Sequence, residues 1–338
     1  MGVFTTEGTE NLMRWDRSSS GFMEVWYSTI THRASGAGVW LRYTLTAPQD
    51  ADPYCEVWGA VFDPKGGMSF AAKDRFGIDR LGAFGRDDGA IVRIADSWLS
   101  ENHLEGSVSS RDGMLDWSLG FEPADRCFQH LPQPLRRRAE RKVSTLCSPN
   151  LSVPFTGTVK VNGRALEFDG DTGCQTHRWG RAHANTWAWS HCSVFDAEDD
   201  AVFEAVAAKA PVGLFPGPTL TFLYLSLDGE DIALNELRPA LGAKSSYTMP
   251  TWAFSAHNEE FKVVGAARTH PARLLQVRYS DPDGSERYCA NSEIADLALE
   301  VYRRAGTRWL HHRSLTATRT SHLEFGRKEP FDEIPVAY

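Results

Sequence analysis

Two-residue turn signals between β-prone runs recur along the chain and constrain its fold more than any other feature. The segment at residues 157–168, GTVKVNGRALEF, places Asn162-Gly163 between two such runs. Both residues tolerate positive φ, so an Asn-Gly pair favours the two-residue hairpin turn. Asp228-Gly229 and a Pro-Asp-Gly turn at 282–284 stand in the same setting. We therefore expect antiparallel hairpins along much of the chain.

Apolar and polar residues also alternate with a period of two. The clearest examples are residues 21–32, GFMEVWYSTITH, and residues 38–48, GVWLRYTLTAP. Such alternation is typical of half-buried strands. Helical periodicity is confined to two short segments, 134–143 and 292–303, and residues 128–156 are expected to form a connection. The pattern predicts an all-β fold of the sandwich or barrel type.

Composition excludes several classes of protein. The chain has 338 residues, more than one antiparallel barrel usually holds, so we infer two β-units. Its net charge of −8 argues against nucleic acid as a partner, and the basic cluster at 135–142 is interpreted as a solvated face. No run approaches the ~20 apolar residues of a membrane span, and no secretory signal is visible. The six cysteines form no close CxxC pair, which favours a reduced, cytoplasmic protein.

The stretch at residues 173–192, GCQTHRWGRAHANTWAWSHC, is rich in His, Trp and Arg. Trp187, Trp189 and His191 occupy alternate positions, which share one face of a strand. A wall that is half apolar and half hydrogen-bonding suits a ligand pocket. A tryptophan-rich barrel core would explain the same residues equally well. The sequence leaves these two interpretations open.

A metal site is the sharpest alternative for this stretch. His177, His183 and His191 are six and eight residues apart. This spacing matches no zinc signature, and an even spacing on a strand indicates only a shared face. We therefore expect no metal and treat the three His as hydrogen-bonding groups.

Two carboxylates stand in apolar surroundings. Glu24 lies near Phe22 and Trp26, and Glu204 lies within AVFEAVAA, residues 201–208. Burial disfavours the charged form of a carboxyl group, raises its pKa and lets it donate a proton near neutral pH. Alternation also allows either side chain to face solvent. There is no G-x-S-x-G elbow and no glycine-rich phosphate loop, so neither a serine nucleophile nor a nucleotide cofactor is expected.

Residues 159–195, VKVNGRALEFDGDTGCQTHRWGRAHANTWAWSHCSVF, resemble the central signature of the carotenoid 1,2-hydratase (hydroxyneurosporene synthase) and tocopherol cyclase-like proteins. In that group a hairpin leads into a Gly-containing segment, a His and Trp-Gly, and then a Trp-x-Trp strand. Residues 14–45 are similar to the family's N-terminal sheet. Residues 281–299 and 321–326 resemble its closing strands. The likeness covers most of the chain.

The resemblance implies two lipocalin-like antiparallel β-barrel units packed together, as in calycins, with an apolar cavity for a long or polycyclic ligand. We divide the chain into residues 1–183 and 184–338. The resemblance also implies alkene protonation or acid-base elimination by a buried acid, without a cofactor. Thr176 and Arg178 depart from the family motif, where an acidic residue and Asn are common, and this argues against a strict carotenoid hydratase.

We predict a lyase or isomerase that hydrates, dehydrates or cyclises a hydrophobic terpenoid or aromatic molecule. The alternative is a non-catalytic carrier of such a ligand, and a redox enzyme ranks third because the dinucleotide fingerprint is missing. A perturbed acid that faces the cavity would favour an enzyme over a carrier. The sequence leaves the oligomeric state open.

The predicted site combines acid-base groups with a binding wall. Arg178 and Arg181 are suited to hold a carboxylate or phenolate oxygen. Trp187 and Trp189 are expected to form an apolar floor. The predicted proton-transfer residues are Glu24, His177 and His191. The predicted substrate contacts are Trp26, Arg178, Trp179, Arg181, His183, Trp187 and Trp189.

Overall fold

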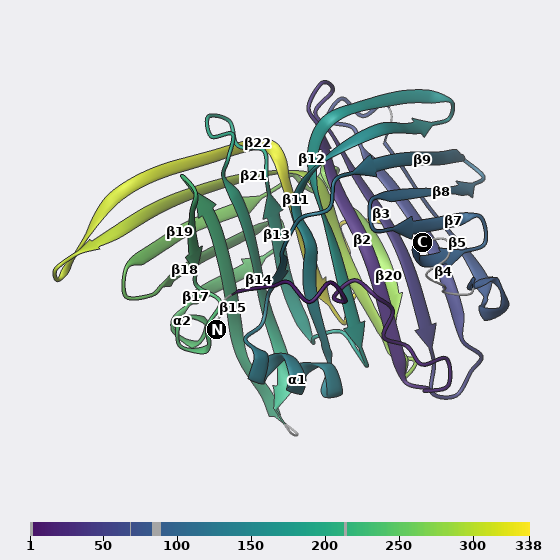
Figure 1. The fold of residues 1–338 in the computed structure, drawn as a ribbon, viewed down its shortest axis with the longest axis horizontal. Helices are drawn as coiled ribbons and strands as arrows, with labels where there is room; N and C mark the ends of the chain where they lie inside the picture. The colour runs from purple at the N-terminus through teal and green to yellow at the C-terminus, as the bar shows by residue number, and fades with distance from the viewer. Residues whose placement is uncertain (1–2, 68, 83–88, 213–214) are drawn as a thin grey trace.

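The computed structural model describes residues 3–67, 69–82, 89–212 and 215–338. Two antiparallel sheets lie side by side and make up most of the molecule (Figure 1). The all-β fold predicted from the sequence is therefore confirmed.

The first sheet comes from the N-terminal half of the chain. Its strands pair in the order β5-β4-β3-β2-β12-β11-β9-β8-β7-β6, with β10 beside β11 and β1 beside β10. The strands are β1 (Phe4–Thr5), β2 (Phe22–His32), β3 (Ala37–Ala47), β4 (Tyr54–Phe62), β5 (Phe70–Gly77), β6 (Ala90–Ile94), β7 (Ser97–Ser100), β8 (His103–Ser110), β9 (Gly113–Phe121), β10 (Cys127–Gln129), β11 (Ser144–Val161) and β12 (Arg164–Gly180).

The second sheet comes from the C-terminal half. Its order is β16-β15-β14-β13-β22-β21-β19-β18-β17, with β20 beside β21. The division proposed between residues 183 and 184 falls in the link between the two sheets. The strands are β13 (Thr186–Cys192), β14 (Val202–Val212), β15 (Phe215–Leu227), β16 (Glu230–Ala233), β17 (Lys244–Thr248), β18 (Thr251–His257), β19 (Phe261–Arg268), β20 (Leu275–Ser280), β21 (Glu286–Ala305) and β22 (Arg308–Arg327).

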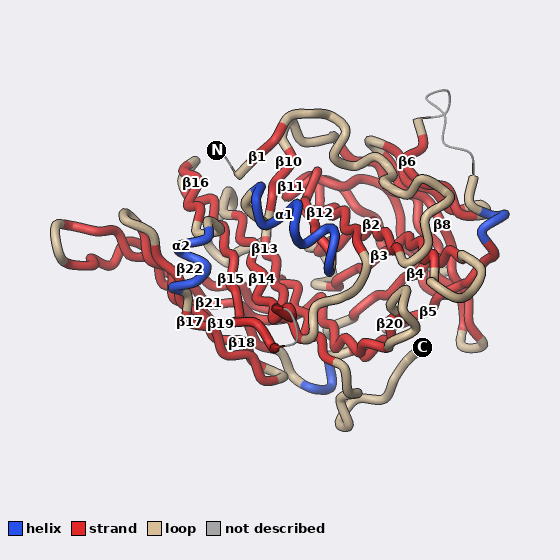
Figure 2. The backbone as a smooth tube through the Cα atoms, turned by 90° about the horizontal axis from the view of Figure 1, so that it is seen from below, coloured by secondary structure: helices blue, strands red, loops and turns tan. Residues whose placement is uncertain are grey.

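The described helices are short, and each packs against one of the two sheets. Helix α1 (Gln133–Lys142) packs against β11 and β12, and α2 (Leu237–Gly242) packs against β15 and β18. In Figure 2 α1 lies where the two sheets meet. Single 3₁₀ turns occupy Ile78–Arg80 and Pro271–Arg273. Among the described residues, no helix has the length and apolar character that a membrane crossing requires.

The turn signals were correct. Asn162 and Gly163 have φ of 51° and 79° and join β11 to β12, while Asp228 and Gly229 have φ of 53° and 75° and join β15 to β16. The Pro-Asp-Gly turn joins β20 to β21. The helix predicted at 134–143 is confirmed as α1.

Two local predictions were wrong. Residues 292–303 lie inside β21 and form no helix, because they pair with β22 on one side and β19 on the other. Residues 144–156 are not a connection but the first part of β11, whose ladder with β12 contains several register shifts. Bulges interrupt the alternation by which a strand is recognised.

Each sheet curls around its own apolar core. In the first sheet β4 and β5 contact β8 across a cluster that includes Leu41 and Leu115. The second sheet encloses a separate cluster that includes Phe203 and Leu299. In the described residues no ladder joins the end strands of either order, so the sheets are open forms of the expected barrels. Both interiors are filled, and a third, tryptophan-rich cluster lies between the sheets.

Candidate functional site

A pocket of about 470 Å³ lies between the two sheets. Strands β2, β3, β11 and β12 of the first sheet form one side, and β13, β14, β15, β20 and β22 of the second form the other. Residues of α1 and α2 also line it, and most of its lining residues are apolar. Its size and lining are typical of a site for a small hydrophobic molecule.

The two tryptophans of β13 form part of the pocket wall. Trp187 and Trp189 occupy alternate positions of the strand, so the shared face predicted from the sequence is confirmed. They are only 8% and 2% exposed, so each belongs to the inter-sheet core and to the pocket wall at once. His191 continues the same face and stacks on Trp189, with 6.3 Å between ring centroids, but it does not line the pocket.

Glu204 holds Trp189 in place from behind the wall. Its Oε1 accepts hydrogen bonds from the Trp189 indole at 2.5 Å and from His130 Nε2 at 2.6 Å. Glu204 and His130 are each 1% exposed and lie outside the pocket lining. Glu204 therefore points neither to solvent nor to the pocket.

Glu324 is the one carboxyl group among the described lining residues. Burial and the nearby Glu293 raise its pKa to about 7, although Arg42, the Trp187 indole and Arg178 oppose the rise. A carboxyl group with this pKa exchanges protons readily near neutral pH. Sequence reasoning missed Glu324. The alternation of SHLEFG at residues 321–326 was a usable signal, because it places Glu324 on the same face of the strand as His322.

His183 forms a buried dyad with Asp281 at the edge of the pocket. Asp281 Oδ1 accepts from His183 Nδ1 at 2.5 Å and from the His183 backbone N–H at 3.0 Å. Burial raises the pKa of Asp281, but the two hydrogen bonds from His183 and the charge of Arg287 outweigh burial and lower it. Burial and the positive charge of Arg178 lower the pKa of His183 to about 3, so its ring is neutral. Its Nδ1 then carries the proton, and Nε2 is an acceptor for which the described part of the chain supplies no donor.

The two arginines predicted as oxyanion ligands lie in different places. Arg178 lines the pocket, and Ser144 Oγ fixes it by accepting from Nε at 3.1 Å and from Nη2 at 2.8 Å. Arg181 is exposed, lies outside the lining, and donates to the Gly21 carbonyl at 3.4 Å. Arg42, which sequence reasoning did not single out, lines the pocket from β3. Its signal was a charged side chain inside a strongly apolar strand.

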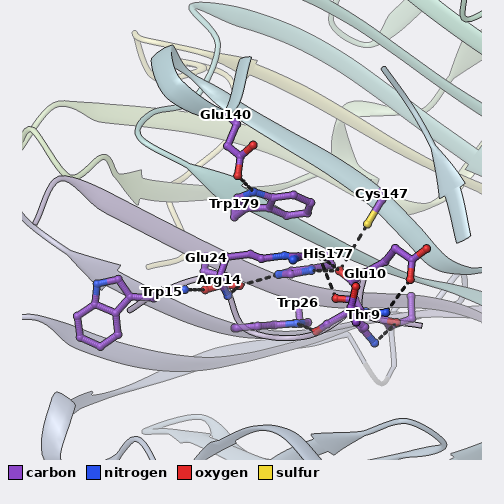
Figure 3. Close-up of polar contacts among 12 residues, drawn as sticks. Thr9, Glu10, Arg14, Trp15, Glu24, Trp26, Glu140, Cys147, His177 and Trp179 are labelled. Carbon is purple, nitrogen blue, oxygen red and sulfur yellow. Dashed lines mark hydrogen bonds and ion pairs between the residues drawn. The ribbon is translucent and has the colours of Figure 1, made fainter. Parts of the chain in front are cut away.

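Glu24 and His177 meet each other but not the pocket (Figure 3). Glu24 Oε1 accepts from His177 Nε2 at 2.8 Å, and both side chains are 0% exposed. The carboxylate of Glu24 also accepts from the backbone N–H groups of Arg14 and Trp15, at 2.7 and 3.0 Å. His177 Nδ1 donates to the Glu10 carbonyl at 2.7 Å. These hydrogen bonds fasten the N-terminal segment to the face of the sheet opposite the pocket.

Trp26 and Trp179 belong to the same cluster. Trp26 stacks on His177 with 4.8 Å between ring centroids, and Trp179 donates to Glu140 of α1 at 2.8 Å. Neither indole lines the pocket. Strand parity explains the separation, because Val25 and Arg178 face the pocket while their neighbours along each strand face away.

His191 and the cysteines complete the set of groups singled out from sequence. His191 Nε2 donates to the Leu151 carbonyl at 2.9 Å, and burial lowers its pKa to about 4. All six cysteines are free and buried. Within the described ranges no group of three or more His, Cys, Asp or Glu residues is arranged to hold a metal ion.

A family model described as tocopherol cyclase-like matches residues 153–327, slightly more than half of the chain. An uncharacterized protein of Mycobacterium tuberculosis strain H37Rv is 26% identical over 315 residues, which cover 93% of this chain and 89% of that protein. A protein from strain CDC 1551 of the same species matches to the same extent.

Two solved structures share the architecture. A protein assigned as AttH from Nitrosomonas europaea superposes with a TM-score of 0.55 at 12% identity, over 91% of this chain and 93% of that one. Kievitone hydratase from Nectria haematococca gives a TM-score of 0.55 at 9% identity, over 96% and 93%. Both matches span the two sheets, so the expected pair of lipocalin-like units packed together is confirmed as the fold.

Proposed function

Because this chain belongs to the tocopherol cyclase-like family, we propose that it is a lyase or isomerase of the hydratase and cyclase type. The proposed substrate is a hydrophobic terpenoid or aromatic molecule bound between the two sheets, and the proposed chemistry uses no redox cofactor. The observation that carries the proposal is Glu324, a carboxyl group with a pKa of about 7 on the wall of an apolar pocket. The shared fold with a hydratase supports the same reaction class.

The proposed reaction begins with proton transfer from Glu324. The C=C bond of the substrate takes the proton, and the carboxyl group becomes a carboxylate. The resulting carbocation is captured by water, is captured by a hydroxyl of the same molecule, or loses a neighbouring proton. These routes give hydration, cyclisation and isomerisation respectively, and in each the released proton returns to Glu324. A positioned acid-base group of this kind contributes ~10²–10⁴-fold in rate.

In the proposed reaction, two indole rings and the newly formed Glu324 carboxylate stabilise the cationic intermediate against the arginines of the same pocket. Trp187 and Trp189 present indole rings to the cavity, and a desolvated cation over such a ring gains about 2 kcal/mol. The neutral His183 ring offers Nε2 as an acceptor for a substrate hydroxyl or for the attacking water. Asp281 fixes the orientation of that ring.

The earlier candidates Glu24, His177 and His191 remain predictions as proton-transfer residues. Their hydrogen bonds to one another and to the backbone do not involve the pocket, so we base the proposal on Glu324. Among the predicted substrate contacts, the proposal retains Arg178, His183 and the two tryptophans of β13.

The test compares the wild-type protein with Glu324→Gln in D₂O. The ligand is first identified by mass spectrometry of molecules extracted from purified protein and is then supplied to both. We expect the wild type to form a product that carries deuterium at carbon, and the variant to form it at least ~10²-fold more slowly. Glu286→Gln, an exposed carboxylate of β21 outside the pocket, is the control.

A carrier protein is the second candidate, and one observation favours it. Leu237 and Leu241 of α2 line the pocket although they are 45% and 57% exposed. Exposed apolar side chains of this kind are what the entrance of a pocket needs if it is to admit apolar molecules. Unchanged ligand and no deuterium incorporation by a wild type that binds the ligand would establish this function and exclude catalysis.

A further inference from the structure

The pocket is positively charged in a negatively charged protein. Its described lining contains four cationic side chains, Arg42, Arg138, Lys142 and Arg178, and a single carboxyl group, Glu324. The whole chain has a net charge of −8. The local excess of positive charge therefore runs against the composition of the chain and needs a local explanation.

Arg42 is a buried cation that forms no ion pair with any described residue, although its charge acts on Glu324 across the pocket. It is 7% exposed, and its guanidinium lies 4.2 Å from the ring centroid of Tyr279 and 5.3 Å from that of Trp58. No described residue accepts a hydrogen bond from its guanidinium, and this includes its buried Nε. Burying an unpaired charge is costly, so native proteins usually supply a partner.

Other unpaired donors surround Arg42. Trp40 and Tyr279 line the same pocket, and the buried indole N–H of the one and hydroxyl of the other find no hydrogen-bond partner among the described residues. Most buried polar groups in proteins are hydrogen-bonded, so several orphan donors around one cavity indicate a ligand that accepts from them. The ligand atom suited to these donors is an oxygen.

Arg178 approaches the same space from a neighbouring strand. Arg42 of β3 pairs with Tyr27 of β2, and Arg178 of β12 pairs with Val25 of β2. The two arginines therefore lie on either side of β2, on its face toward the pocket. Ser144 occupies Nε and Nη2 of Arg178, and no described residue accepts from its Nη1. Burial and the charge of Arg42 lower the pKa of Arg178 to about 10, and an anion between the two cations would relieve that repulsion.

We infer that the pocket takes an amphipathic ligand whose anionic oxygen group, a carboxylate or a comparably acidic enol, is held between Arg42 and Arg178. The inference rests on the proposed function, because it names the substrate class of the same pocket. The apolar body of the ligand lies against Trp187 and Trp189. Arg138 and Lys142 of α1 attract the anion toward the mouth. Arg42 thus takes the anion-binding role first expected of Arg181.

The test uses two probes that differ only in charge, cis-parinaric acid and its methyl ester. Binding is followed by probe fluorescence and by quenching of tryptophan emission at pH 8, where the acid is ionised. The ester is the more hydrophobic probe, so burial alone favours it. We expect the wild type to bind the acid at least about tenfold more tightly than the ester, as a charge-assisted hydrogen bond provides.

Arg42→Met and Arg178→Met should each remove most of this preference, because each weakens binding of the acid far more than binding of the ester. Arg181→Met, which alters an exposed arginine outside the pocket, is the matched control and should keep the preference. Thermal melting checks the folding of each variant. If Arg42→Met fails to fold, the inference is tested by the ratio of acid to ester affinity in the wild type and by the same ratio in Arg178→Met. Equal affinity for acid and ester, or a preference that survives in Arg178→Met, overturns the inference and leaves the hydrophobic pocket intact. Binding of neither probe overturns the proposed function as well.

Discussion

Glu324 couples folding to pH through a single proton. Its pKa is raised from 4.5 to about 7 by burial and by Glu293. Between these values the folded protein keeps the proton and the unfolded chain loses it, so the free energy of unfolding falls as pH rises from 4.5 to 7 and this contribution is flat above 7. We expect Glu324→Gln to remove this slope, measured by urea unfolding across that range. Turnover by the wild type should also fall above about pH 7, because Glu324 is then deprotonated and no longer available as an acid.

The pair formed by Glu24 and His177 predicts a loss of stability in a higher pH range. Burial lowers the pKa of His177, but the neighbouring Cys147 and Glu24 outweigh burial and raise it from 6.5 to about 9. The folded state therefore holds a proton that the unfolded chain releases above pH 6.5, and the associated stability is lost as pH rises from 6.5 to 9. Glu24→Gln should weaken this dependence, with the contribution of Cys147 remaining, and destabilise the protein by about 3–5 kcal/mol, as breaking a buried pair does.

Denaturant unfolding of Glu24→Gln beside Glu7→Gln tests this prediction. Glu7 is an exposed carboxylate of the same N-terminal segment, and its variant should unfold like the wild type. A Glu24→Gln protein that keeps wild-type stability but loses ~10²-fold in turnover would instead support the proton-transfer role inferred from sequence.

From the sequence alone, it could be predicted only which residues share a face of a strand. Parity places Trp187 and Trp189 on one face without any tertiary information. It does not reveal which face of β2 or β12 meets the second sheet, and Glu24 and His177 lie on the face away from the pocket. Glu324 reaches the pocket because β22 pairs with β13, a contact across more than a hundred residues that local sequence does not encode.

Helix α1 contacts groups on both faces of the first sheet. Leu135, Arg138 and Lys142 line the pocket, while Glu140 accepts a hydrogen bond from Trp179 at 2.8 Å. The α1 sequence is mostly charged and buries none of its residues fully, so docking depends on a few contacts. The basic cluster, interpreted from sequence as a solvated face, therefore contributes to the pocket as well.

We expect Glu140→Ala to loosen α1 and to raise the dissociation rate of methyl cis-parinarate several-fold. The lost hydrogen bond is worth about 1 kcal/mol, so the melting temperature should change little. Stopped-flow fluorescence measures the rate. Arg137→Ala, an exposed position of the same helix outside the pocket lining, serves as the comparison. Equal dissociation rates in both variants would mean that α1 does not control access.

Elements were predictable where the chain turns tightly and less so inside long strands. Asn162-Gly163 specifies its hairpin because both residues accept positive φ. Residues 292–303 offered spaced apolar side chains that suit a helix, yet Leu297, Leu299 and Val301 are buried at alternate positions of β21. Tertiary pairing with β19 and β22 decided between two patterns that the segment carries at once.

At the scale of the whole molecule, the pocket lies where the two sheets approach each other closely. Thr31 of β2 and His322 of β22 share a hydrogen bond of 3.2 Å across the interface, and His322 also contacts Glu293. Glu293 is 0% exposed, and burial holds its pKa well above its ordinary value. Gly38 of β3 lies directly against Glu293, and this close approach requires a residue without a side chain.

Gly38→Ala tests the role of this contact. The added Cβ would lie 2.3 Å from the Cβ of Glu293 and 2.4 Å from its carbonyl oxygen, so the sheets must separate locally. Overpacking of this kind costs about 1–3 kcal/mol. We expect a lower free energy of unfolding together with weaker binding of methyl cis-parinarate, because the pocket walls belong to different sheets.

Gly120→Ala provides the matched control for that variant. Gly120 lies in β9, and the nearest atom to an added Cβ is Thr156 Oγ1 at 3.6 Å, an ordinary contact distance. Its unfolding and its probe affinity should equal those of the wild type. If Gly38→Ala unfolds and binds like Gly120→Ala, the spacing of the sheets at Gly38 is not what sets the pocket. A Gly38→Ala protein that loses affinity more than stability would instead show that the pocket is the part of the interface most sensitive to sheet separation.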